Sequence, residues 1–138
     1  TCEQFAHICE SLMPRYFRRK NKTSTKKNPA TVPFQAVRIE VNAEFHALSE
    51  FMSAIPKYLA SPSRLAIISF HSLEDKLVTN AMRSWEQGEQ VPRGFPVEGK
   101  PGRGKLLTKK AIEPSAEEIA KNSRSRSARL RVFQVINN

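Results

Sequence analysis

The sequence is poor in cysteine and has no long apolar run. Its two cysteines, Cys2 and Cys9, would lie about 10 Å apart along a helix, which is too far for a disulfide. They form no Cys-x-x-Cys pair of the kind that binds zinc. No stretch approaches the ~18 consecutive apolar residues of a membrane span, and no signal peptide is visible. These absences predict a cytoplasmic protein with no disulfide, no metal centre and no membrane span.

Glycine is also scarce. The five glycines are scattered between Gly88 and Gly104, and none belongs to a Gly-rich loop that could cradle the phosphates of a nucleotide cofactor. We therefore expect no cofactor-binding residue in this sequence. His7 and His46 fall on predicted helices without acidic or cysteine partners at metal-ligand spacing, so we expect both to be structural or to face solvent.

Acidic residues are outnumbered by basic ones. The 138 residues include 23 Lys and Arg against 13 Asp and Glu, which gives a formal net charge of +10. Residues 15–27 contain seven cations and no acid. Clustered positive charge favours a polyanionic partner such as RNA, and a generally basic, soluble surface is the alternative.

The most informative run extends from Leu65 to Trp85. Residues 65–70 are almost all apolar and rich in β-branched side chains, which predicts a strand covered on both faces, as in a parallel sheet. From Ser72 the apolar spacing becomes helical, with Ser72 as the predicted N-cap and Asp75 in the capping-box position. Because ligands of open α/β sheets bind at the carboxyl ends of strands, His71 and Ser72 lie where a functional site is expected.

The first half of the sequence is predicted to be helical. Residues 1–13 show one apolar stripe, which indicates an amphipathic helix. Apolar residues at alternating steps of four and three over 41–59 predict a second helix. Pro56 should kink this helix or end its regular hydrogen bonding.

The second half is predicted to end in a pair of strands. A long loop occupies residues 86–105, and loops of this length are usually functional or mobile. The predicted strands are 106–112 and 128–136, with a short helix between them that Ser115 and Glu118 cap. We expect the two strands to form an antiparallel pair at the edge of a sheet. Together these elements predict an α/β fold.

Three segments resemble one family. Ile68-Ser-Phe-His-Ser-Leu-Glu-Asp75, Phe34-Gln-Ala-Val-Arg-Ile-Glu-Val-Asn42 and Asn122-Ser-Arg-Ser-Arg-Ser-Ala-Arg-Leu-Arg-Val132 are similar to motifs of the RsmH (MraW) family of ribosomal RNA methyltransferases, in the family's order. The resemblance implies transfer of a methyl group from S-adenosylmethionine to the exocyclic 4-amino nitrogen of a cytidine. That cytidine would lie in the decoding region of 16S (small-subunit) ribosomal RNA, so the RNA or the 30S subunit is the expected partner.

The resemblance also implies a domain organisation. Residues 1–27 resemble the end of an inserted helical domain, and residues 28–138 resemble the C-terminal half of a class I (Rossmann-like) methyltransferase core. The S-adenosylmethionine loop of the family lies in the first half of its proteins, so we expect this chain alone to be inactive. An unpaired sheet edge would make it marginally stable or self-associated, for example as a homodimer.

His71 is the candidate catalytic residue. It could orient the target base or shuttle a proton, or it could hydrogen-bond the backbone and hold the turn between strand and helix. The candidate RNA-binding residues are Arg15, Arg18, Arg19, Lys20, Lys100, Arg103, Lys105, Arg124 and Arg126. Arg129 and Arg131 would share one strand face and could bind phosphate or pair with acids such as Glu117 and Glu118.

Departures from the family pattern leave other functions open. Asn28, Val32, Pro62 and Ser123 stand where the family often has other residues, which indicates a divergent lineage. The main alternative to the methyltransferase is a non-catalytic, basic RNA-binding module of α/β fold. A remnant that only docks on a partner is a third hypothesis.

Overall fold

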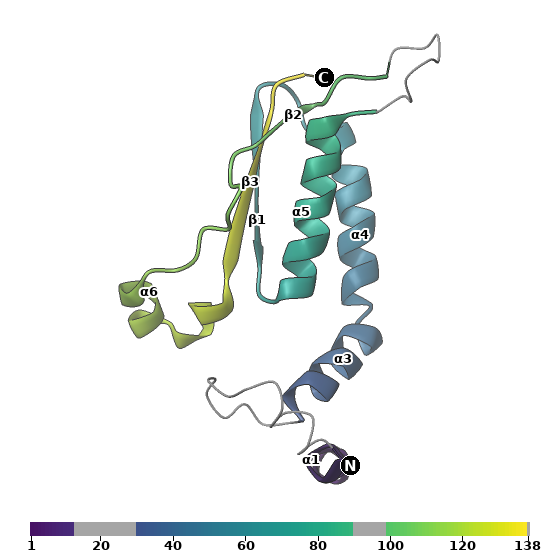
Figure 1. The fold of residues 1–138 in the computed structure, drawn as a ribbon, viewed down its shortest axis with the longest axis vertical. Coiled ribbons are helices and arrows are strands. Elements are labelled where there is room, and N and C mark those ends of the chain that lie inside the picture. The colour runs from purple at the N-terminus through teal and green to yellow at the C-terminus, as the bar shows by residue number, and fades with distance from the viewer. Residues whose placement is uncertain (13–29, 90–98, 138) are drawn as a thin grey trace. The chain divides into compact units, whose positions relative to one another are not determined.

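The computed structural model describes residues 1–12, 30–89 and 99–137. The chain divides into two compact units, Thr1–Ala47 and Leu48–Asn138, which are described separately (Figure 1). The basic run 15–27, with Arg15, Arg18, Arg19 and Lys20, lies outside the described residues. Its proposed contact with RNA stays a prediction.

The first unit is helical. Helix α1 (Cys2–Leu12) confirms the helix predicted over 1–13. The ring of Phe5 meets that of Phe34 edge to face, with centroids 5.1 Å apart, and Phe34 belongs to helix α3 (Thr31–Val41). Cys9 and Ile39 are buried, whereas Ile8, Leu12 and Val37 are exposed, so each helix buries only part of its apolar surface.

The helix predicted to begin near Val41 begins three residues later. Helix α3 ends at Val41 and helix α4 runs over Glu44–Ala54, because Ala43 between them has a left-handed φ of 50°, which no α-helix contains. Val41 is therefore exposed rather than part of the α4 stripe. The prediction for Pro56 is confirmed, since α4 stops at Ala54 and a 3-10 turn, η1 (Ile55–Tyr58), follows.

The second unit contains a three-stranded sheet of order β1-β3-β2. Strands β1 (Ser63–Ser69) and β3 (Arg129–Val135) confirm two of the predicted strands. Both β1 and β2 (Gly104–Leu106) pair antiparallel with β3. The predicted antiparallel pairing of the last two strands is confirmed, but β3 lies in the centre of the sheet and the predicted bounds 106–112 are wrong. Strand β2 ends at Leu106, and further along Ile112 makes only an isolated bridge with Leu130.

One face of the sheet is covered by helix α5 (Ser72–Gln87), as Figure 1 shows. The core formed there consists of Met52, Val78, Met82, Leu106, Phe133 and Val135. The opposite face carries Ala66 and Ile68, which are exposed. The apolar run of β1 predicted cover on both faces, but within the described residues only one face is covered, and β3 is the only strand that pairs with β1.

A short helical segment precedes β3. In helix α6 (Ala116–Lys121) the Ser115 hydroxyl accepts a hydrogen bond from the backbone N–H of Glu118 at 3.2 Å, which confirms the predicted cap. A 3-10 turn, η2 (Ser123–Ser127), follows. Among the described residues, no helix has the length and apolarity needed to cross a membrane.

Candidate functional site

The carboxyl end of β1 leads directly into α5, and His71 is the residue at the junction. His71 has extended backbone angles (φ −141°, ψ 162°) and is the N-cap of α5. The predicted cap, Ser72, is instead the first helical residue. The capping-box acid is accordingly Glu74 and not Asp75, since the box joins the N-cap to the third helical residue.

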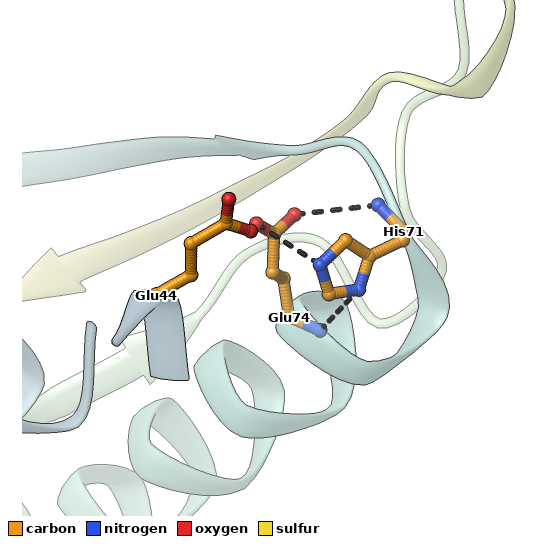
Figure 2. Close-up of side chains that lie close together, drawn as sticks. All are labelled: Glu44, His71 and Glu74. Carbon is orange, nitrogen blue, oxygen red and sulfur yellow. Dashed lines mark hydrogen bonds and ion pairs between the residues drawn. The ribbon is translucent and has the colours of Figure 1, made fainter. Parts of the chain in front are cut away.

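The His71 ring and the Glu74 carboxylate contact each other, and each also contacts the backbone N–H group of the other residue (Figure 2). The backbone N–H of Glu74 donates to His71 Nδ1 at 3.2 Å, and Glu74 Oε2 accepts from the backbone N–H of His71 at 3.3 Å. His71 Nε2 lies 3.2 Å from Glu74 Oε1. Because Nδ1 accepts a hydrogen bond, the proton of the neutral tautomer would lie on Nε2, which faces the Glu74 carboxylate at this distance without forming a hydrogen bond.

This geometry gives His71 a structural role. Both ring nitrogens face Glu74, and Glu74 Oε2 also accepts from the backbone N–H of Phe70 at 2.9 Å. Three backbone N–H groups at the start of α5 are thereby satisfied, as a helix N-terminus requires. The structure therefore favours the interpretation in which His71 holds the turn, while its contact with a base or a proton remains a prediction.

A buried ion pair fastens α5 to β3. Arg131 Nε and Nη2 donate to the two carboxylate oxygens of Asp75 at 2.7 and 2.8 Å, and the two residues are only 8% and 6% exposed. Arg131 Nη1 donates further to the carbonyl oxygens of Thr108 and Lys109 at 3.1 and 3.2 Å. Two parallel charge-assisted bonds fix the orientation of both side chains. Arg131 thus joins three segments of the chain.

The ion pair corrects two expectations. The sequence predicts Asp75 in the capping box, and Arg131 on phosphate or on acids such as Glu117 and Glu118, but Asp75 and Arg131 bind each other. Arg129 Nη1 also lies 3.5 Å from Asp75. The hydrogen bonds from Arg131 hold the pKa of Asp75 below its ordinary value, and Asp75 in turn raises the pKa of Arg131.

Two candidate RNA-binding arginines lie at this same end of the sheet. Arg124 and Arg126 belong to η2, whose last residue stands just before β3, and Arg129 at the start of β3 pairs with Ser69 at the end of β1. The side chains of Arg124 and Arg126 are exposed, and in the described part of the chain neither of these two guanidinium groups has a hydrogen bond or ion pair. The Asn122 side chain accepts from the backbone N–H of Arg124 at 3.2 Å and thereby holds the turn.

The other candidate cations lie at the opposite end of the sheet. Gly104 pairs with Val135, which pairs with Ser63 at the start of β1. The neighbouring candidates are Lys100, Arg103 and Lys105. The strand register separates these three residues from the η2 arginines by the length of β1.

The fold and this site define an α/β protein with an ordered polar network and free cations at the carboxyl end of a strand. A family model described as the MraW methylase family matches residues 1–136. The chain therefore belongs to the MraW methylase family.

Relatives from several bacteria carry one name. The chain is 42% identical over 139 residues to "Ribosomal RNA small subunit methyltransferase H" of Lawsonia intracellularis, an alignment that covers 99% of this chain and 43% of the relative. It is 48% identical over 110 residues to the protein of that name from Thioalkalivibrio sulfidiphilus, covering 78% and 35%. The Shewanella loihica protein is 47% identical over 111 residues, covering 78% and 36%. The chain thus spans less than half the length of these relatives.

Proposed function

We propose that this chain is the C-terminal portion of an S-adenosylmethionine-dependent ribosomal RNA methyltransferase of the cytoplasm. Residues 1–27 would end an inserted helical domain, and residues 28–138 would form the C-terminal half of a class I core. The observation that carries the proposal is the family match over residues 1–136. The names of the relatives supply the substrate, small-subunit ribosomal RNA.

The sheet supports the place of this portion within a larger core. In the described residues, one edge of β1 is unpaired and the sheet face that carries Ala66 and Ile68 is uncovered. An apolar strand of this kind is stable when further strands and helices pack against it. Strands of the remaining core would extend the sheet from the free edge of β1, which places His71 at a carboxyl edge shared with those strands.

The proposed reaction methylates the exocyclic 4-amino nitrogen of a cytidine in the decoding region. This amine is a weak nucleophile because its lone pair is delocalised into the ring. Close alignment with the methyl donor and polar groups around the amine lower the barrier, and the base must first leave its stack. In this chain, Arg124 and Arg126 would hold RNA phosphates, while Asp75 and Arg131 keep the carboxyl edge of the sheet rigid.

Two of the described glycines pack closely against other parts of this chain. A Cβ atom at Gly102 would lie 1.9 Å from the carbonyl oxygen of Glu86, and one at Gly104 would lie 1.9 Å from that of Gln134. These glycines allow chain to pack against chain. S-adenosylmethionine supplies the methyl group when bound, and we place its site mostly in the part of the enzyme outside this chain.

The test is methyl transfer by the full-length enzyme. Small ribosomal subunits that lack the modification are incubated with the enzyme and S-adenosylmethionine labelled in the methyl group, and subunits already modified serve as the control. We expect label in the RNA of the unmodified subunits alone. Binding of RNA without any transfer would contradict the proposal and support the non-catalytic RNA-binding module.

A further inference from the structure

A hollow lies beside the start of β1, at the end of the sheet opposite His71. It has a volume of about 340 Å³ and is lined by Lys57, Tyr58, Leu59, Ala60 and Arg103. The first of these residues belong to η1 and the short connection that leads into β1. Because seven strand residues span roughly 23 Å, this hollow is distinct from the site at the carboxyl end.

Tyr58 is exposed in a way that the core does not explain. Its side chain is 80% exposed, although the next residue, Leu59, packs against the core. Pro56 lies in the first turn of η1 and fixes the backbone there. In the part of the chain that the structure describes, the Tyr58 hydroxyl has no hydrogen bond. An aromatic ring is thus held at the surface by a short, anchored turn.

Arg103 is held at the hollow by its backbone. Its N–H donates to the carbonyl oxygen of Trp85 at 2.7 Å, and its own carbonyl accepts from the N–H groups of Ile136 and Asn137 at 2.9 and 3.0 Å. The guanidinium has no partner among the described residues, and the same holds for the ammonium of Lys57. No acidic residue lines the hollow, so two free cations flank one exposed ring.

This combination fits a single-stranded nucleic acid. Proteins that bind single strands stack bases on exposed aromatic rings and hold the backbone with neighbouring cations. A protein partner would be expected to bring acids to the cations, whereas a nucleotide brings both a base for the ring and a phosphate for Lys57 and Arg103, which line the hollow together with Tyr58. The formal net charge of +10 also favours RNA over a protein.

We propose that this hollow binds one nucleotide of a single-stranded RNA segment, with the base stacked on Tyr58 and its phosphates contacted by Lys57 and Arg103. The inference rests on the proposed function only for the identity of the RNA. It adds a second anchor point at the far end of the sheet from the η2 arginines. A bound strand would therefore be held at two places.

The experiment compares variants of the full-length enzyme in binding a fluorescently labelled, single-stranded RNA oligonucleotide, followed by anisotropy. We expect Tyr58→Ala to weaken binding about 5- to 150-fold, in line with the loss of one stacked base, without changing the salt dependence. Tyr58→Phe should bind like the parent. Arg103→Ala should flatten the slope of log K against log salt by about 0.7, the value for one phosphate contact on a single strand.

Matched controls separate these effects from general ones. Phe51→Ala removes another exposed ring, which is 44% exposed on α4, and Arg83→Ala removes an exposed cation of α5; neither should change binding. Equal affinity of the parent and Tyr58→Ala would overturn the proposal. Weaker binding of Tyr58→Ala to whole subunits but not to the oligonucleotide would also overturn it, because a protein would then occupy the hollow.

The outcome is independent of the methylation test. If the parent transfers methyl groups and Tyr58→Ala binds RNA normally, the proposal that the hollow binds RNA is wrong and the proposed function stands. If the parent transfers no methyl group and Tyr58→Ala still loses RNA affinity, the proposal that the hollow binds RNA stands and the methyltransferase proposal is wrong.

Discussion

The ion pair between Asp75 and Arg131 predicts a large loss of stability when its charge balance is broken. Asp75→Asn keeps the shape of the side chain but removes its charge. Arg131, which is 8% exposed, is then left as a buried cation with carbonyl partners only. Removing one member of a buried pair costs about 3–5 kcal/mol of unfolding free energy. The total free energy of unfolding of a native protein is about 5–15 kcal/mol, so the expected loss is a large fraction of it.

The assay is urea unfolding of the full-length enzyme followed by the fluorescence of Trp85. This is the one tryptophan of the sequence, and its ring meets Phe133 in the core with centroids 5.4 Å apart. The double variant Asp75→Leu with Arg131→Met serves as the control, because apolar replacement of both partners is often neutral. A free energy of unfolding within about 0.5 kcal/mol of the parent for Asp75→Asn would refute the reasoning.

The same pair predicts a pH dependence. The pKa of Asp75 is lower in the folded chain than its ordinary value, so the carboxylate binds its proton more readily when unfolded. Its contribution to stability is therefore complete above the ordinary value of about 4 and is lost as the pH falls through the folded pKa. The parent should lose stability over this acidic range more steeply than Asp75→Asn. Parallel curves would contradict the assignment.

Two further predictions concern the cap and the cations. His71→Ala should lower the free energy of unfolding by about 1 kcal/mol in a urea titration, because the N-cap of α5 is lost. His71→Asn, which keeps a side chain able to cap the helix, should restore the free energy of unfolding to that of the parent. Loss of methyl transfer by a stable His71→Asn variant would instead give His71 a catalytic role. Arg124→Ala with Arg126→Ala should flatten the salt dependence of RNA binding by up to about 0.7 per lost contact, and an unchanged slope would show that these arginines face solvent in the complex.

Much of the second unit could be predicted from sequence because its periodicity is local. The apolar run of β1 and the helical spacing of α5 identified both elements, and Ser115 identified the start of α6. The sequence predicts the N-cap of α5 one residue too late, at Ser72, because serine is a usual N-cap residue and histidine is not. In the structure, the imidazole Nδ1 accepts the hydrogen bond that a hydroxyl would have accepted.

The features that sequence could not supply depend on distant or rare contacts. The break between α3 and α4 depends on the left-handed backbone of Ala43, and alanine seldom adopts that conformation. The apolar spacing of the sequence therefore predicts one continuous helix across this position. Asp75 and Arg131 are 56 positions apart. One signal for their burial was present, because Arg131 alternates with Phe133 and Val135 on the face that proved to be the core.

The central claim is that this chain belongs to an enzyme that methylates a cytidine of small-subunit ribosomal RNA on its 4-amino nitrogen. The most direct measurement is mass spectrometry of nucleosides and of RNA fragments after the full-length enzyme has acted on unmodified small subunits. We expect the added methyl group on the exocyclic nitrogen of one cytidine, within a fragment from the decoding region. A methyl group on the ribose, on a ring carbon or in another region of the RNA would contradict the account.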